Sequence, residues 1–203
     1  MSRRVIVLAA FIVVVVGGSI AAFTYLSASS KTIYIDKAQI AAPAVDLGPS
    51  APGILQAVYV AEGDIVAPNT VVAEVGTELI KTTQGGLVTV VNNNIGKTVS
   101  PGNTVVETID PLALRVTGQI AEDKGLVDIK PGQRAVFEID AFGSKQYEGI
   151  VDEVAPEAVS SDVVFTISDK RQEQNFEVKV RFDTVKYPEL KNGMSAKIWV
   201  YKN

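Results

Sequence analysis

Apolar and polar residues alternate one by one over long stretches in the second half of the chain. Within 112–120, one face is expected to carry Leu112, Leu114, Val116 and Ile120. Within 176–183, every second residue is again apolar. A period of two predicts antiparallel strands with one buried and one wet face. Further strands are expected at 32–40, 135–139, 149–154 and 195–201. The short stretch 121–129 could be helical, although Gly125 weakens that prediction.

The stretch 53–109 contains the same β pattern twice. Gly53-Ile-Leu-Gln-Ala-Val58 precedes Gly63, and Gly86-Leu-Val-Thr-Val-Val91 precedes Gly96, at an offset of 33 residues. The alignment extends over two half-motifs, 53–75 and 86–109. Each half carries its own glycine turns and is too small to bury an apolar face alone. The sequence therefore predicts a single compact unit made from two similar halves.

The N-terminal segment has the pattern of a membrane anchor. Residues 5–26 form a run of 22 residues without a charge, and as a helix this run would be about 33 Å long, enough for a bilayer core. Arg3 and Arg4 precede it and should hold the N-terminus in the cytoplasm. A cleaved signal peptide is the alternative, since small residues follow at 27–30, but signal cores are usually only about 7–15 residues long. We expect 1–31 to comprise a cytoplasmic tip, a single-pass anchor in the inner (cytoplasmic) membrane and a linker, with the bulk of the chain outside the cytoplasm.

Composition excludes several kinds of chemistry. The 203 residues include no Cys and no His, which removes disulfides, thiolate nucleophiles, imidazole bases and the usual zinc ligands. Beyond the anchor the chain has an excess of acidic residues, so a basic nucleic-acid surface is not indicated. Paired acids such as Glu122-Asp123 and Asp152-Glu153 are interpreted as solvent-exposed residues and not as a catalytic pair. No catalytic, cofactor-binding or metal-binding residue is predicted, and the protein is not expected to be an enzyme.

Several stretches in order resemble a known family. They are the duplicated half-motif, Leu114–Asp123 followed by Ile129–Gln133, Tyr147–Val151, and Leu190–Met194. Together they resemble the HlyD-type membrane fusion proteins, the periplasmic adaptor subunits of efflux transporters. The resemblance implies a lipoyl-like barrel-sandwich hybrid over 32–110, then a small antiparallel β-barrel over 111–203. It also implies self-association, often as a ring of six, and an inner-membrane transporter as partner, with an ABC permease and ATPase favoured over the RND class.

The chain departs from most of that family between its half-motifs. Only the ten residues from Gly76 to Gly85 join them, which at about 3.3–3.6 Å per residue cannot form a long α-helical hairpin. We also expect no membrane-proximal domain after the barrel, which the sequence predicts to extend to its last residues. We therefore expect a minimal adaptor that acts next to the membrane. An envelope structural or binding protein that uses the same fold without a pump is the alternative.

A few residues are candidates for special roles. Asn92, Asn93 and Asn94 are interpreted as a turn, since Asn tolerates left-handed backbone; the alternative, drawn from the resemblance, is a polar ring facing a central lumen. Trp199 should point away from the barrel interior and could contact the transporter or a neighbouring subunit. Lys81 lies near the junction of the halves, where biotinyl and lipoyl carriers place their modified lysine, but we interpret it as a solvated turn residue.

Overall fold

The computed structural model describes residues 32–159 and 174–202, which form two compact units. Of the described residues, the barrel unit contains 32–38, 118–159, 174–180 and 195–202, and the repeat unit contains Gln39–Thr117 and Arg181–Met194. The described residues form β-strands and short 3-10 turns. This confirms the prediction of a mainly β protein. Each unit is described below by itself.

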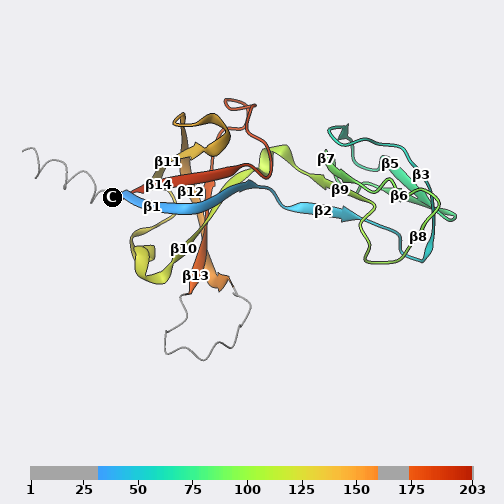
Figure 1. The fold of residues 1–203 in the computed structure, drawn as a ribbon, viewed down its shortest axis with the longest axis horizontal. Helices are drawn as coiled ribbons and strands as arrows, with labels where there is room; N and C mark the ends of the chain where they lie inside the picture. Colours follow the sequence, from blue (N-terminus) through green and yellow to red (C-terminus); the bar gives the residue numbers. More distant parts are fainter. Residues whose placement is uncertain (1–31, 160–173, 203) are drawn as a thin grey trace, which may run out of the picture. The chain divides into compact units, whose positions relative to one another are not determined.

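The barrel unit is built on a closed barrel of six strands (Figure 1). In order around the barrel these are β1 (Thr32–Ala41), β10 (Arg115–Ala121), β13 (Asn175–Arg181), β12 (Gln146–Val159), β11 (Arg134–Ile139) and β14 (Ser195–Tyr201). Along most of their length the strands bury alternate residues, although β12 buries none beyond Val151. Phe137 and Tyr147, which oppose each other in register, stack in the core with ring centroids 5.5 Å apart. The period of two in the sequence thus becomes one dry interior and one wet exterior.

The first strand is placed differently from the expectation. We expected 32–110 to form the lipoyl-like unit, but β1 closes the barrel between β10 and β14. Ile33 and Ile35 are 5% and 1% exposed, and the Ile35 side chain fills space that Gly118 leaves open. A Cβ added at Gly118 would lie only 2.8 Å from Ile35 Cγ2. The strand therefore contributes to the core of the barrel.

Two smaller predictions also need correction. Leu112 does not share the buried face of 114–120, because it lies on a 3-10 turn, η1 (Pro111–Ala113), and is 68% exposed. The Asp110 side chain accepts a hydrogen bond from the Leu112 amide and so fixes this turn. The stretch 121–129 is not one helix but two 3-10 turns, η2 (Glu122–Lys124) and η3 (Leu126–Asp128). Gly125 separates them with φ +96°, a left-handed conformation that breaks a helix.

The repeat unit consists of two four-stranded sheets with matching strand orders. The first is β2 (Ala44–Leu47), β9 (Val106–Ile109), β7 (Gly86–Val91) and β4 (Ile65–Val66); the second is β6 (Glu78–Lys81), β5 (Val71–Val75), β3 (Gly53–Val58) and β8 (Thr98–Val99). Strands of one half correspond to strands of the other in the same positions. The sequence repeat is therefore a structural repeat, as predicted.

The two halves are interlocked through exchanged strands. β4 of the first half pairs with β7 of the second, and β8 of the second half pairs with β3 of the first. The Gly63 amide donates to the Val88 carbonyl at 2.9 Å, and the Gly96 amide donates to the Leu55 carbonyl at 2.8 Å. The same register shift follows Leu55 in one sheet and Val88 in the other. Each half therefore completes the sheet of its partner half, and neither has its full core alone.

Candidate partner-binding surfaces

The outer face of the barrel carries an aromatic surface on adjacent strands. We define it as Tyr34 of β1, Trp199 and Tyr201 of β14, Arg134 of β11 and Ile150 of β12. Tyr34 is 47% exposed, Tyr201 40% and Ile150 45%, while Trp199 is partly buried. Strand pairing brings these residues together, since Arg134 lies opposite Ile150.

Ring and cation contacts hold the aromatic surface in place. Tyr34 and Trp199 have ring centroids 5.2 Å apart, and the Arg134 guanidinium lies 5.7 Å from the centre of the Tyr201 ring. The Tyr34 hydroxyl donates to Asp36 at 2.7 Å, and this hydrogen bond raises the pKa of Tyr34. Aromatic rings with one apolar side and one wet edge are the side chains that most often anchor protein interfaces.

Trp199 is the one member of this surface that the sequence identified. Its neighbours Ile198 and Val200 are fully buried, which confirms that Trp199 points away from the barrel interior. The ring is only partly exposed because Tyr34 packs against it. The other members were missed because alternation indicates which way a side chain faces, but not which strands are neighbours. The role of Trp199 as a partner contact remains a prediction.

The Asn residues form a turn at the end of β7. The Asn92 side-chain oxygen accepts from the Asn94 amide at 3.0 Å and from the Asn94 side chain at 2.7 Å. Asn93 and Asn94 are exposed, and Ile95 beside them is 59% exposed. These contacts fit the interpretation of the stretch as a turn. A ring of Asn side chains facing a lumen remains a prediction.

The connection between the halves is a strand. Gly76, at φ +59°, turns the chain into β6, which pairs with β5. The Glu78 carboxylate accepts from the Ser50 amide at 3.0 and 3.1 Å. Lys81 lies exposed on β6 opposite Val71. The expectation of a solvated residue is met, but the expectation of a turn is wrong, because Lys81 is a strand residue. The connection between the halves therefore adds an edge strand, Glu78–Lys81, to the sheet.

Acidic residues on the barrel form surface ion pairs. Lys179 lies 3.1 Å from Glu153 and 3.5 Å from Glu177. The hydrogen bond from Lys179 to Glu153 raises the pKa of the lysine. Within 32–159 and 174–202, no group of three or more acidic residues is placed to hold a metal ion.

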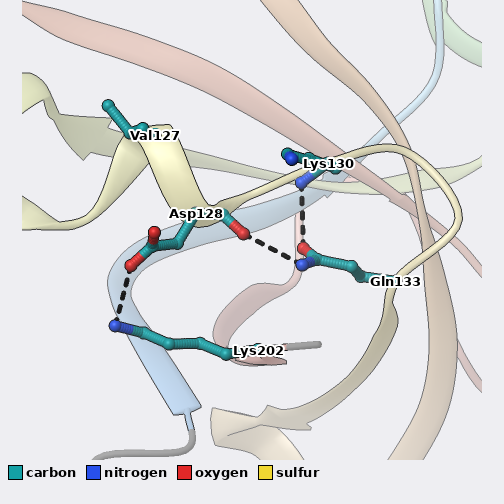
Figure 2. Close-up of a pocket in the computed structure, with 5 residues that line it drawn as sticks. All are labelled: Val127, Asp128, Lys130, Gln133 and Lys202. Atoms are coloured by element: carbon teal, nitrogen blue, oxygen red, sulfur yellow. Dashed lines mark hydrogen bonds and ion pairs between the residues drawn. The ribbon is translucent and has the colours of Figure 1, made fainter.

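A polar hollow lies beside the turn η3, where β10 leads into β11 (Figure 2). Its volume is about 220 Å³, and its lining is Val127, Asp128, Lys130, Gln133 and Lys202. The Lys202 ammonium lies 2.9 Å from the Asp128 carboxylate. Gln133 is 3% exposed; its amide donates to the Asp128 carbonyl and accepts from the Lys130 amide, both at 2.9 Å. These contacts brace the loop that borders the hollow.

The predicted anchor lies outside the residues that the structure describes. This applies to residues 5–26 and to Arg3 and Arg4 alike. In the described part of the chain, none of the helices has the length and apolar character needed to span a bilayer.

Comparisons with known proteins place the fold. No protein-family model matches the chain, and no curated protein matches it either. A MacA–MexA chimera containing the Pseudomonas aeruginosa MexA α-hairpin domain matches with a TM-score of 0.67 and 17% identity, over 85% of this chain and 82% of the other. The periplasmic adaptor protein EmrA matches with a TM-score of 0.55 and 10% identity, over 85% and 99% of the two chains. A membrane fusion protein from Streptococcus pneumoniae matches with a TM-score of 0.59 and 13% identity, over 85% and 99%.

At these identities the likeness establishes the fold, which is that of membrane fusion proteins and periplasmic adaptors. It confirms the resemblance that the sequence motifs indicated.

Proposed function

We propose that this protein is a membrane-anchored adaptor of an export system, held by residues 5–26 with its β units outside the cytoplasm. The observation that carries the proposal is the combination of an interlocked repeat unit with a six-stranded barrel, the fold found in a periplasmic adaptor and in a membrane fusion protein. The described residues supply contact surfaces and braced loops. The function is therefore scaffolding, and no step of covalent chemistry is assigned to it.

The adaptor acts by binding one conformation of its transporter better than another. A bound scaffold shifts a conformational equilibrium only to the extent that its affinity differs between the two states. We propose that the transporter belongs to the ABC class. We also propose that the adaptor assembles into a ring, with six as the expected number of subunits. The strand β6 in place of a long hairpin supports a minimal adaptor whose action is confined to the space next to the membrane.

The aromatic surface is the proposed contact with the transporter or with a neighbouring subunit. Interface hot spots are enriched in Trp, Tyr and Arg, and this surface combines all three around Trp199. The carboxylates Asp36 and Glu148 hold Tyr34 and Arg134 in place. A partner would therefore meet side chains that are already ordered, which lowers the entropy cost of binding.

Affinity purification of the full chain from native membranes tests the proposal. We expect a polytopic transporter to co-purify in mild detergent, and Trp199→Ala to reduce its recovery. Tyr59→Ala is the matched control, because Tyr59 is an exposed aromatic residue (55%) in the repeat unit, outside the aromatic surface. Recovery of soluble envelope proteins alone would favour an envelope binding protein without a pump.

A further inference from the structure

The loop between β10 and β11, residues 122–133, lies at the end of the barrel where the chain enters β1. Gly125 packs against Ile33, the second residue of β1, since a Cβ at Gly125 would lie 3.5 Å from two carbons of that side chain. The C-terminal end of β14 is at the same end, where Lys202 pairs with Asp128. We call this the entry end of the barrel.

The most exposed apolar side chain of the entry end is at the tip of the loop. Val127 is 83% exposed, and Figure 2 shows its side chain directed away from the Asp128–Lys202 ion pair. Behind it the loop is braced by the buried amide of Gln133. Held outward on a braced loop, this side chain contributes nothing to the core and is available to an external contact.

The charges of the loop 122–133 and Lys202 balance. The loop and Lys202 together carry three acids and three bases, which are Glu122, Asp123, Asp128, Lys124, Lys130 and Lys202. Two ion pairs, Lys124–Asp123 and Lys202–Asp128, hold four of these charges. Because the loop and Lys202 together carry no net charge, anionic headgroups do not repel them and are not preferred over neutral headgroups.

The length of the tether sets how far the entry end can lie from a bilayer. Six residue steps separate Leu26, the end of the predicted anchor, from Thr32, where β1 begins. At about 3.3–3.6 Å per residue, Thr32 lies within about 20 Å of the edge of the hydrocarbon core. The headgroup layer occupies about 5–8 Å of that distance. With the anchor in the bilayer as proposed, the entry end is therefore the part of the barrel that the tether keeps close to the membrane.

We propose that the loop 122–133 contacts the lipid bilayer, with Val127 entering the headgroup region as a second point of attachment beside the anchor. This inference rests on the anchor in the proposed function but not on the identity of the transporter. The occupant is lipid because the tether holds the loop at the bilayer whether or not a protein partner is present.

Single-cysteine labelling tests this contact, since the chain contains no native Cys. The full chain carrying Val127→Cys is labelled with an environment-sensitive fluorophore and reconstituted into phosphatidylcholine–phosphatidylglycerol vesicles without any other protein. We expect a blue-shifted emission and quenching by a lipid that carries its quencher near the headgroup. Ser144→Cys is the matched control, because Ser144 is exposed on the turn at the other end of the barrel, between η4 (Asp140–Phe142) and β12.

The outcomes separate the loop contact from the anchor. Quenching at position 127 but not at position 144, little changed when phosphatidylglycerol is omitted, supports the proposal. Equal, weak quenching at both positions, in a chain that resists alkaline extraction from the vesicles, overturns the contact and leaves the anchor intact. A chain that is released by alkaline extraction overturns the anchor and the contact together. A label at 127 that is shielded only after a transporter is added shows a protein contact and overturns the lipid contact.

Discussion

Replacing Gly86 with alanine should destabilise the repeat unit through one backbone contact. Gly86 is buried at the start of β7, and a Cβ there would lie 2.6 Å from the Ile109 carbonyl oxygen and 3.2 Å from its carbon. No side-chain rotation relieves a clash with backbone, so β7 and β9 must move apart. Overpacking of this kind costs about 1–3 kcal/mol, and the loss of glycine flexibility in the unfolded chain offsets about 0.4–1 kcal/mol.

The expected net loss is on the order of 1 kcal/mol, which lowers Tm by about 4–8 °C for a unit of this size. Calorimetry on the full chain in detergent measures it. Gly53→Ala is the matched control, because Gly53 is the equivalent position in the other half. There the nearest atom is the Val75 Cγ1 methyl at 2.9 Å, a side-chain atom, although the Gly76 nitrogen follows at 3.2 Å. We expect a smaller loss for this variant. Equal stability of Gly86→Ala and the wild type, or a larger loss for Gly53→Ala, would refute the reasoning.

Three further predictions concern single side chains. Gln133→Ala removes a buried amide that bridges two backbone groups; the unfolding free energy should fall by about 1–3 kcal/mol in chemical denaturation, and an unchanged midpoint would contradict the bracing role. Trp199→Ala should leave the far-ultraviolet circular dichroism unchanged but weaken partner recovery, and a collapse of the fold would indicate a structural role instead. If the turn lines a lumen, Asn94→Ala should alter transport without altering ring assembly. Unchanged transport would contradict the lumen role and leave only the interpretation as a turn.

The duplication was the part of the fold that the sequence predicted best. The spacing of Gly63 and Gly96 reappears as two reciprocal hydrogen bonds, and the register shifts after Leu55 and Val88 keep the same offset. Glycines at tight turns and close backbone approaches leave a local signal, which can be read without knowledge of the partner strand.

The edge strands and the boundary of the barrel could not be predicted in the same way. β2 and β6 occupy equivalent edges of the two sheets, yet their sequences, AVDL and ELIK, show no repeat. Alternation identified β1 as a strand, but the sheet that it joins depends on long-range pairing. The aromatic surface was missed for the same reason, since Tyr34 and Trp199 are far apart in sequence and meet only through that pairing.

The central claim is that several copies of this protein act together on one membrane transporter. Native mass spectrometry of the complex, purified from its own membranes through a tag on this chain, measures both parts of that claim at once. The account predicts a particle that contains multiple copies of the 203-residue chain bound to a polytopic transporter. A tagged chain that leaves the membrane as a single copy, without any polytopic protein under conditions that preserve known membrane complexes, would contradict it.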